Sequence, residues 1–402
     1  MNILFLSLSR FKNIEERGIY TDLMREFVRR GNKVYVGSPS ERRYGMPTSL
    51  IKDGNIEILK IKTLNIQKAN IIEKGIGTLL LEYQFDKAIS EFWGDIKFDL
   101  VLYATPPITF NKVIEKIKNR CGARSYLMLK DIFPQNAVDL GMMKEGSLLH
   151  KIFRKKEERL YEISDHIGCM SPANCEYVIK HNPWLNPAKV ELCPNAVEPI
   201  EQLSISEEER NRFFADYGIP TDKTLFIYGG NLGKPQGLGF LLQVVEANEK
   251  RDNSFIIVVG NGTEYPRIAA WFEEHKPKNA KLMAALPKAD YDKLVRLCDV
   301  GLIFLDRRFT IPNFPSRLLS YLENSMPVLL ASDPNTDMGF IAEREGFGLW
   351  ALSGDIAKFM DNMATLARNK KTTIAMGKKG KAFLLENYTV DKVADHIYKS
   401  LN

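Results

Sequence analysis

Short apolar segments alternate with amphipathic helical segments along almost the whole chain. Five strand-like runs come first, ILFLS, KVYVG, FDLVLYA, RSYLML and HIGCMS, and five more follow a polar stretch, LFIYGG, FIIVVG, KLMAAL, VGLIFL and PVLLAS. Apolar runs of this length between helices are typical of parallel strands that are buried on both faces of a sheet. The pattern predicts an α/β protein of two Rossmann-like domains facing a cleft, with ligands at the carboxyl ends of the strands.

The polar stretch between residues 194 and 206 separates the two series of strands, and we expect the domain boundary there. A chain of 402 residues is long enough for two domains. We predict a first domain over residues 1–198 and a second over residues 199–385. The final amphipathic segment, about residues 386–402, could either cap the second domain or cross back to the first.

Composition argues against several classes of protein. The five cysteines form no CxxC pair and the five histidines lack metal-ligand spacing, so neither a disulfide framework nor a metal site is expected. No apolar run reaches the roughly 18 residues that span a bilayer, and MNILFLSLS lacks the flanks of a signal peptide. The net charge of +6 favours anionic partners only weakly, and no aromatic residues interleave with basic ones as nucleic-acid binding would require. We expect a cytoplasmic protein without metal or cofactor.

The turn after the first strand of the second domain has features of a phosphate-binding loop. In GGNLGKPQGLG, Gly230 and Gly237 precede a helix, where bare backbone N–H groups suit a phosphate. Lys234 could neutralise a diphosphate, and the next turn, with Gly260 and Gly262, could form the floor of a base pocket. A tight strand-to-helix connection would explain the same glycines.

The segment FPSRLLSYLENSMPVLLAS, residues 314–332, predicts a second anion-binding turn. Ser316 is expected to cap the helix that follows, which would leave the N–H groups of residues 317–319 open toward the glycine loop. The Arg317 guanidinium would add a fixed pair of donors for phosphate oxygens. A capped helix with a surface arginine is the alternative. Two turns directed at one place favour the diphosphate of a nucleotide.

Five segments together resemble one family. KDIFPQNAVDLG is similar to its Asp-aromatic-Pro-x-x-Ala-Val-x-Leu-Gly stretch, ISDHIGCMSPANCEYVI to its Ala-Asp-x-Ile strand and Ser-Pro, and CPNAVE to its Pro-Asn-Gly-Val-Asp linker entry. YGGNLGKPQGLGFLL resembles its Gly-Asn-x-Gly-x-x-Gln-Gly loop, and FPSRLLSYLENSMPVLLAS its Pro-Ser-Lys-x-x-Glu-Tyr-x-x-x-Gly-x-Pro-Val segment. The family is glycosyltransferase family 4, retaining enzymes of the GT-B fold, and the resemblance is to its bacterial capsule and O-antigen transferases.

The resemblance implies a metal-independent enzyme that moves a sugar from a nucleotide-diphosphate donor in the second domain to an acceptor in the first. We expect the donor to be a UDP-activated N-acetylated amino or deoxyamino sugar, and the acceptor to be a sugar linked to undecaprenyl diphosphate. No protein nucleophile is required if the departing diphosphate takes the acceptor proton on the same face. A UDP-sugar 2-epimerase and a non-catalytic nucleotide-sugar-binding subunit are the alternatives.

The motif segments and the turns near them supply two sets of candidates. The candidates for catalysis are Asp131, Lys130, Arg317 and Lys234. The candidates for donor binding are Gly18, Gly230, Asn231, Gln236, Gly237, Gly260, Gly262, Pro315, Ser316, Leu318, Ser320 and Glu323. The family's two glutamates, spaced E-x7-E, fall on Pro312 and Ser320, so Glu323, one helical turn further on, could take the ribose contact.

The segment GSLLHKIFRKKEERLYEI has the composition of an interfacial helix. Leu148, Leu149 and Ile152 stand among basic residues, as in helices that lie on an anionic membrane. A helix packed on the first domain with a solvated basic face would explain the same residues. Because an undecaprenyl-linked acceptor lies at the inner leaflet, we expect a protein that is peripheral on the inner face of the cell membrane through residues 148–159.

Overall fold

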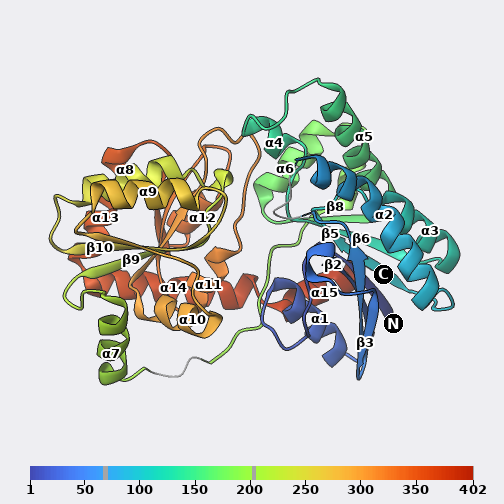
Figure 1. Cartoon of the computed structure of the whole chain (residues 1–402), viewed down its shortest axis with the longest axis horizontal. Coiled ribbons are helices and arrows are strands. Elements are labelled where there is room, and N and C mark those ends of the chain that lie inside the picture. Colours follow the sequence, from blue (N-terminus) through green and yellow to red (C-terminus); the bar gives the residue numbers. More distant parts are fainter. Residues whose placement is uncertain (67–70, 202–204, 402) are drawn as a thin grey trace. The chain divides into compact units, whose positions relative to one another are not determined.

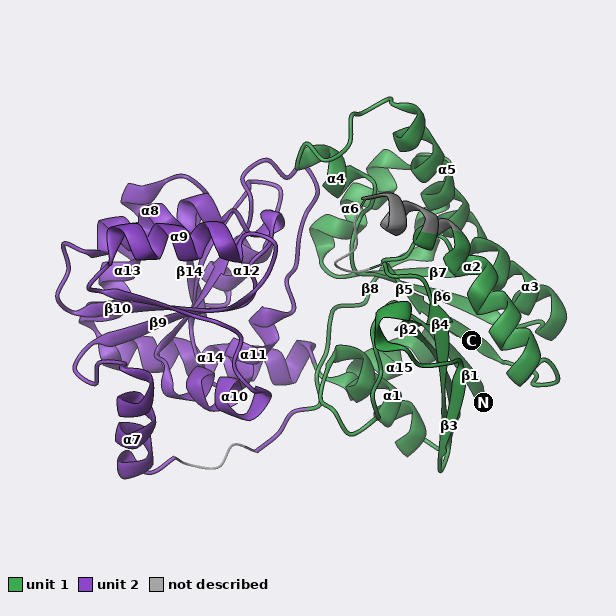
Figure 2. Ribbon diagram, in the orientation of Figure 1, with its two compact units in different colours: residues 1–198, 389–402 green, residues 199–388 purple. Residues whose placement is uncertain are grey.

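The chain folds into two compact units (Figures 1 and 2). The computed structural model describes residues 1–66, 71–201 and 205–401. Unit 1 comprises residues 1–198 and 389–402, and unit 2 comprises residues 199–388. Residues 202–204 of the expected linker and residue 402 of the expected final helix lie outside the described residues. The last helix, α15 (Val390–Leu401), belongs to unit 1 and packs on α1 (Ile19–Arg29).

Unit 1 is built on an eight-stranded sheet in the order β3-β4-β2-β1-β5-β6-β7-β8. Its strands are β1 (Asn2–Leu6), β2 (Lys33–Glu41), β3 (Ser49–Asp53), β4 (Ile56–Thr63), β5 (Leu100–Ala104), β6 (Arg124–Leu129), β7 (His166–Cys169) and β8 (Val190–Leu192). All neighbours pair in parallel except β3, which is antiparallel to β4. The connecting helices are α2 (Ile71–Trp93), α3 (Asn111–Cys121), α4 (Gln135–Asp139), α5 (Leu148–Ile163) and α6 (Pro172–His181), with single turns η1 (Arg42–Tyr44) and η2 (Pro187–Lys189).

Unit 2 is built on a six-stranded parallel sheet in the order β11-β10-β9-β12-β13-β14. Its strands are β9 (Thr224–Asn231), β10 (Ser254–Asn261), β11 (Ala280–Met283), β12 (Val300–Phe304), β13 (Val328–Ser332) and β14 (Gly348–Leu352). Its helices are α7 (Glu207–Tyr217), α8 (Leu238–Asn248), α9 (Tyr265–His275), α10 (Lys288–Leu297), α11 (Arg317–Glu323), α12 (Met338–Arg344), α13 (Ile356–Arg368) and α14 (Lys370–Asn387), with the single turn η3 (Lys234–Gln236). Figure 1 shows α8 and α9 on one side of this sheet and α10 and α14 on the other.

The strand order of unit 2 indicates where a ligand crevice is expected. Numbered by their appearance within the unit, the strands run 3-2-1-4-5-6, which is the Rossmann order. In such sheets ligands bind at the carboxyl ends of the first and fourth strands, where the winding direction reverses. These strands are β9 and β12, so the loops after them are the place to look for a site.

Each sheet has its own apolar core. In unit 1, Phe5 and Leu102 pack in a cluster that also includes Ile397 of the last helix, and in unit 2 Tyr228 and Phe359 belong to the corresponding cluster. All ten predicted apolar runs contribute a strand, because strands covered by helices on both faces carry few polar residues. The predicted α/β fold of two Rossmann-like domains is thus confirmed. Within the described ranges, no helix combines the length and the hydropathy needed to cross a membrane.

The two segments that cross between the units leave unit 1 at one place. The chain departs after Glu198 and returns at Thr389. Val197 and Thr389 form an isolated parallel bridge, and the N–H of Val390 donates to the Val197 carbonyl at 3.1 Å. Both crossing segments are therefore fixed next to each other on unit 1.

Candidate functional site

Three loops of unit 2 meet at the carboxyl ends of β10, β9 and β12, which are neighbours in the sheet. The N–H of Leu232, after β9, donates to the carbonyl of Asn261 at the end of β10 at 2.9 Å. The N–H of Asp306, after β12, donates to the carbonyl of Pro235 at 3.0 Å. These backbone bonds tie the glycine loop to the loops on both sides of it.

The glycines of these loops are required by the backbone. Gly230, Gly237 and Gly260 have φ of +119°, +57° and +152°, which side chains rarely adopt. A Cβ on Gly260 would lie 1.9 Å from the Gly230 oxygen, and one on Gly262 would lie 2.2 Å from the Leu232 oxygen. The backbone roles are those that the sequence indicated, whereas the roles of these glycines toward a donor stay predictions.

The Arg317 side chain lies over the glycine loop. Its guanidinium carbon is 4.4 Å from the centroid of the Tyr228 ring, and its Nη2 donates to the Gln236 side chain at 2.9 Å. A Cβ on Gly230 would be 3.7 Å from the same Nη2. The other terminal nitrogen, Nη1, is buried and has no hydrogen-bond partner among the described residues. A buried donor without a partner carries a desolvation cost, which an anion bound at this place would remove.

Two further tyrosines shape the floor of this site, and the sequence analysis missed both. The Tyr321 hydroxyl of α11 accepts from the N–H of Gly229 at 3.2 Å and donates to the Ile227 carbonyl at 3.1 Å. Tyr291 of α10 lies so close to β9 that a Cβ on Gly229 would be 2.2 Å from its hydroxyl. Burial raises the pKa of Tyr291 to about 12, so its hydroxyl stays neutral. The tyrosines hold the end of β9 beneath the Arg317 guanidinium.

The start of α11 differs from its prediction. Ser316 is exposed and its side chain makes no capping bond, because its backbone is helical (φ −63°, ψ −16°) and not extended as a capping residue requires. The N–H of Leu318 donates to the Pro315 carbonyl at 3.2 Å, and that of Leu319 donates to the Ser316 carbonyl at 3.1 Å. The prediction that these two N–H groups are open to a ligand was therefore wrong, since a tight first turn satisfies them locally.

The remaining donor candidates of unit 2 lie at different depths. Asn231, the last residue of β9, and Lys234, the first of η3, are exposed, and Ser320 is half-buried on α11. Glu323 is only 7% exposed, and its Oε1 accepts from the N–H of Ile200 at 3.4 Å. Glu323 thus contacts the linker, and the ribose contact that we expected of it stays a prediction.

In unit 1, Lys130 and Asp131 follow β6 and are held by the end of β5. The Thr105 hydroxyl accepts from the N–H groups of both residues, at 2.9 and 3.1 Å. The Asp131 carboxylate accepts from the Asn136 amide at 2.8 and 2.7 Å, and burial raises its pKa to about 6. Lys130 donates through Nζ to the Cys193 carbonyl at 3.2 Å, and burial lowers its pKa. Asp131 can therefore exchange a proton near neutral pH, while Lys130 is directed toward the interior.

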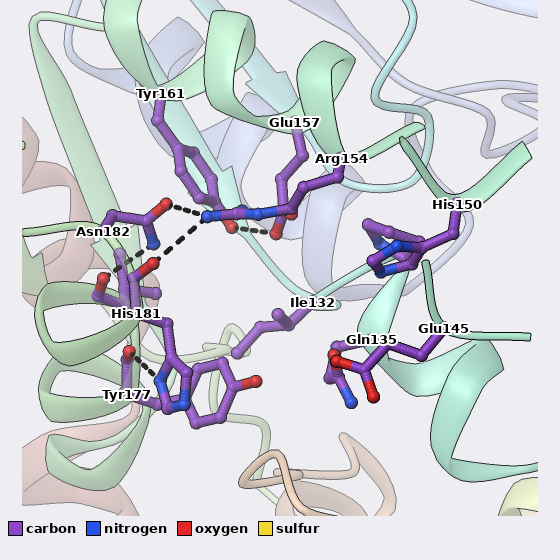
Figure 3. Close-up of a pocket in the computed structure, with 12 residues that line it drawn as sticks. Ile132, Gln135, Glu145, His150, Arg154, Glu157, Tyr161, Tyr177, His181 and Asn182 are labelled. Atoms are coloured by element: carbon purple, nitrogen blue, oxygen red, sulfur yellow. Dashed lines mark hydrogen bonds and ion pairs between the residues drawn. The ribbon is translucent and has the colours of Figure 1, made fainter. Parts of the chain in front are cut away.

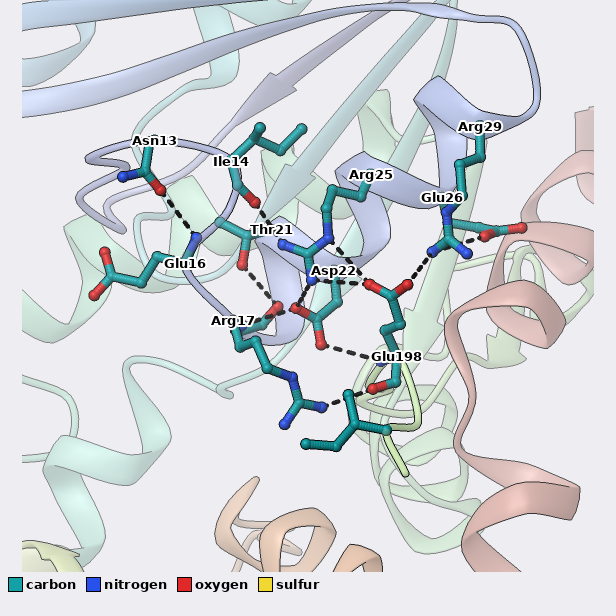
Figure 4. A network of polar contacts seen from close by, with 12 residues as sticks. Asn13, Ile14, Glu16, Arg17, Thr21, Asp22, Arg25, Glu26, Arg29 and Glu198 are labelled. Carbon is teal, nitrogen blue, oxygen red and sulfur yellow. Dashed lines mark hydrogen bonds and ion pairs between the residues drawn. The ribbon is translucent and has the colours of Figure 1, made fainter. Parts of the chain in front are cut away.

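Gly18, at the start of α1, belongs to a polar network that anchors the linker (Figure 4). Its N–H donates to Asp22 Oδ1 at 2.9 Å, and Asp22 also accepts from Arg25 at 2.6 Å and from the N–H of Glu198 at 3.0 Å. The φ of Gly18 is 175°, an extended value that any residue adopts. Its amide is thus engaged within unit 1, and the sequence carried no sign of this network because Glu198 is remote along the chain.

The predicted basic helix forms as α5, with its apolar residues exposed at its start. Leu148, Leu149 and Ile152 are 77%, 53% and 43% exposed. Arg154, by contrast, pairs with the buried Glu157 at 2.5 Å, so this basic residue of the helix is engaged inside unit 1 and does not belong to a solvated basic face. Membrane contact of this helix stays a prediction.

Comparisons with known proteins agree with these features. Residues 209–383, most of unit 2, match the family model described as Glycosyl transferases group 1. Over 327 residues the chain is 20% identical to a probable glycosyltransferase, WbjE, of Pseudomonas aeruginosa, covering 80% of this chain and 78% of that protein. Over 255 residues it is 22% identical to a putative colanic acid biosynthesis glycosyl transferase, WcaI, of Escherichia coli K12, covering 61% of this chain and 60% of that protein.

The fold is similar to that of solved structures over the whole chain. The crystal structure of HepE from Anabaena in complex with UDP-glucose superposes with a TM-score of 0.70 at 14% identity, covering 100% of this chain and 99% of that one. At such low identity the likeness shows the fold alone, which is the GT-B fold of two Rossmann-like domains. Together with the family match of unit 2 and the two relatives, it identifies the chain as a glycosyltransferase of the GT-B fold.

Proposed function

We propose that the chain transfers a sugar from a UDP-sugar to an acceptor with retention of the anomeric configuration. The observation that carries the proposal is the Arg317 guanidinium, which lies over the glycine loop at the switch point of unit 2. One of its buried nitrogens has no hydrogen-bond partner in the part of the chain that the structure describes. Such a cation, held on a ring face and an amide, suits the diphosphate of a nucleotide. The HepE complex with UDP-glucose, on a similar fold, supports UDP as the nucleotide. We keep the N-acetylated amino or deoxyamino sugar as the expected donor.

The chemistry that we propose needs no nucleophile from the protein. The bond between the anomeric carbon and the diphosphate breaks, and Arg317 together with the exposed Lys234 stabilises the charge of the departing UDP. The acceptor hydroxyl then bonds to the anomeric carbon on the face that UDP has left. Its proton passes to the departing diphosphate oxygen, so charge and atoms balance. Independence of a metal ion stays a prediction of this scheme.

We place the acceptor on unit 1 and infer that it is a sugar linked to undecaprenyl diphosphate, in capsule or O-antigen biosynthesis. The printed function of WcaI, colanic acid biosynthesis, supports a polysaccharide product. Asp131, with its raised pKa, is the polar group that we assign to the acceptor. The exposed Leu148, Leu149 and Ile152 of α5, next to the exposed Lys151, would hold the protein on the inner face of the cell membrane from the cytoplasm.

A donor panel tests the proposal. The full chain is incubated with UDP-, GDP- and ADP-sugars and with sugars linked to lipid diphosphate, and both free nucleotide and extended lipid are measured. We expect free UDP and an extended lipid in equal amounts, with the anomeric configuration of the donor retained. Conversion of a UDP-sugar without any acceptor would support a 2-epimerase, and binding without turnover would support a non-catalytic subunit. Either result would contradict the proposal.

A further inference from the structure

A polar pocket of about 200 Å³ lies within unit 1, between α4, α5 and α6 (Figure 3). We call it the α5–α6 pocket, and its polar lining includes Gln135, Glu145, His150, Tyr177 and His181. Its apolar floor includes Ile132, which directly follows Asp131 in the chain. The pocket contains none of the candidate site residues, although it begins next to one of them. Its volume is below the roughly 300–1,000 Å³ of common ligand sites, so it suits a single ring and not a nucleotide.

The charged pair at the back of the pocket is occupied within the protein. Arg154 donates through Nη1 to Glu157 at 2.5 Å, and through Nη2 to the Asn182 side chain at 2.5 Å and the His181 carbonyl at 3.2 Å. Its Nε lies 3.4 Å from a carboxylate oxygen of Glu158. Every nitrogen of the guanidinium thus has a protein partner. The arginine joins α5 to α6 and builds the pocket wall, and its charge is engaged by Glu157 and Glu158.

The two histidines offer complementary ring nitrogens. His150 accepts through Nδ1 from the N–H of Gly146 at 3.2 Å, so its neutral ring carries the proton on Nε2 and donates there. His181 lies with Nδ1 2.9 Å from the Tyr177 carbonyl, which can only accept, so the Nε2 of its neutral ring accepts. Figure 3 shows His150 with Glu145 and Gln135 on one side of the pocket, and Tyr177 with His181 on the other. A hydroxyl donor and a hydroxyl acceptor can both be satisfied between them.

The charge of the lining disfavours anions. The charges of Arg154 and Glu157 cancel, and the exposed Glu145 leaves one negative charge beside two histidines. A phosphate or a uronic acid would meet that carboxylate, while Arg154, the arginine of the described lining, is already paired with Glu157 and Glu158. The Tyr177 and His181 rings stack at 3.9 Å with an interplanar angle of 20°, and such rings present apolar surface to the C–H groups of a sugar. Aromatic surface, one carboxylate, one amide and two imidazoles fit a ring that carries several neutral hydroxyls.

We propose that the α5–α6 pocket binds a neutral sugar ring of the acceptor glycan, next to the unit that receives the transferred sugar. This inference rests on the proposed function, because it assigns the pocket to the acceptor of that transfer. Ile132 of the pocket floor directly follows Asp131 in the chain, and the exposed Leu148 and Leu149 precede His150 on α5. An acceptor chain would therefore pass from Asp131 through the pocket toward the apolar start of α5. The pocket then selects acceptors by the hydroxyl pattern of one internal sugar.

The test uses the full chain and simple methyl glycosides as probes. Saturation-transfer NMR compares methyl glycosides of glucose, galactose and N-acetylglucosamine with methyl glucuronide and glucose 1-phosphate. We expect at least one neutral glycoside to bind, and the affinity to fall at least tenfold in Tyr177→Leu and in His150→Ala. His150→Gln keeps an N–H donor and should restore part of the binding. The two anionic probes should bind more weakly than the neutral one.

Helix α9 provides a matched control, because the same stacked pair recurs there. The rings of Trp271 and His275 are 4.2 Å apart with an interplanar angle of 12°, and His275 Nδ1 lies 2.9 Å from the Trp271 carbonyl. This pair belongs to unit 2 and does not line the α5–α6 pocket. His275→Ala removes the stacked histidine of α9 and should therefore leave glycoside binding unchanged, whereas His181→Ala, its counterpart in the pocket, should weaken it as Tyr177→Leu does.

A parallel titration with UDP separates this inference from the proposed function. We expect the variants of the α5–α6 pocket to bind UDP as the wild type does. Failure of every neutral glycoside to bind, equal binding in wild type and both pocket variants, or tighter binding of an anionic probe would overturn the pocket assignment alone. A wild-type protein that binds a neutral glycoside but does not bind UDP would overturn the donor site alone.

Discussion

Replacing Arg317 by alanine removes a guanidinium that lies over the glycine loop, and the cost in UDP affinity can be worked from the geometry. Nη1 has no hydrogen-bond partner among the described residues and Nη2 is shared with Gln236, so at least one charge-assisted hydrogen bond to a diphosphate is lost. Each such bond is worth about 1.5–3 kcal/mol, which corresponds to a roughly 10- to 150-fold weaker Kd for UDP. We expect turnover to fall on the order of a hundredfold as well, because the same cation would stabilise the departing diphosphate.

The stability of the protein should change little in the same variant. The stacking of Arg317 on Tyr228 is worth about 0.5–2 kcal/mol, while burying its unpaired nitrogen costs about 1–3 kcal/mol, so the two effects oppose each other. Calorimetric titration of UDP, with thermal melts, measures both quantities. Arg308→Ala is the control, since that guanidinium lies on the neighbouring loop and pairs with Asp306 at 2.8 Å. A Kd for the Arg317 variant within twofold of wild type, or an equal loss in the control, would refute the assignment.

Three further substitutions test separate parts of the account. Burial raises the pKa of Asp131 to about 6 from an ordinary value near 3.8, so folding takes up a proton between pH 3.8 and 6. The stability of the protein should therefore fall as the pH rises through this range, and thermal melts of Asp131→Asn should lack this fall. Gly260→Ala would place a Cβ 1.9 Å from the backbone oxygen of Gly230 and should weaken UDP binding more than tenfold. Gly239→Ala, whose Cβ meets nothing within 4 Å, should leave the Kd unchanged, and equal Kd values for UDP in the two variants would contradict the close approach of the loops. Replacing the exposed Lys151 and Lys155 by glutamine should weaken sedimentation with anionic liposomes by about 1 kcal/mol each, roughly 30-fold together. A wild-type protein that never sediments with such liposomes would end the membrane proposal.

The fold was largely predictable because its strands are buried. Each of the ten apolar runs that we predicted as strands became one, since helices cover both sheets and leave few polar positions on them. Four strands of the described residues, β3, β4, β8 and β14, were not among these runs. β3 (Ser49–Asp53) is mostly exposed, and β8 (Val190–Leu192) is a partly exposed strand of three residues at the edge of the sheet. Their pairing depends on neighbours that local sequence does not reveal.

The candidate site was predictable only where its signal is local. Gly230 and Gly237 stand out because a positive φ demands glycine, and Arg317 because it follows a short turn motif. Tyr291 reaches the site from α10, and nothing near it in sequence distinguishes it from a core tyrosine. The prediction that Ser316 caps α11 was wrong because it rested on a local preference alone. Serine favours helix caps, but the tight first turn of α11 overrides that preference.

The same limit applies to the α5–α6 pocket. His150 and His181 are 31 positions apart, and only the fold of unit 1 brings their helices to opposite sides of one cavity. Their roles as donor and acceptor depend on which backbone group holds the other ring nitrogen. The YVIKH spacing that stacks Tyr177 on His181 is visible in the sequence, yet the WFEEH segment shows the same spacing without this pocket.

Hydrogen–deuterium exchange of the full chain with and without UDP tests the central claim most directly, because it locates the nucleotide without assuming a sugar or an acceptor. The account predicts that UDP slows exchange most strongly in unit 2, in the loops of residues 228–237, 260–264 and 305–320, with the effect greatly reduced in Arg317→Ala. Protection confined to unit 1, or no protection of these loops at saturating UDP, would contradict the placement of the donor at the carboxyl ends of β9 and β12.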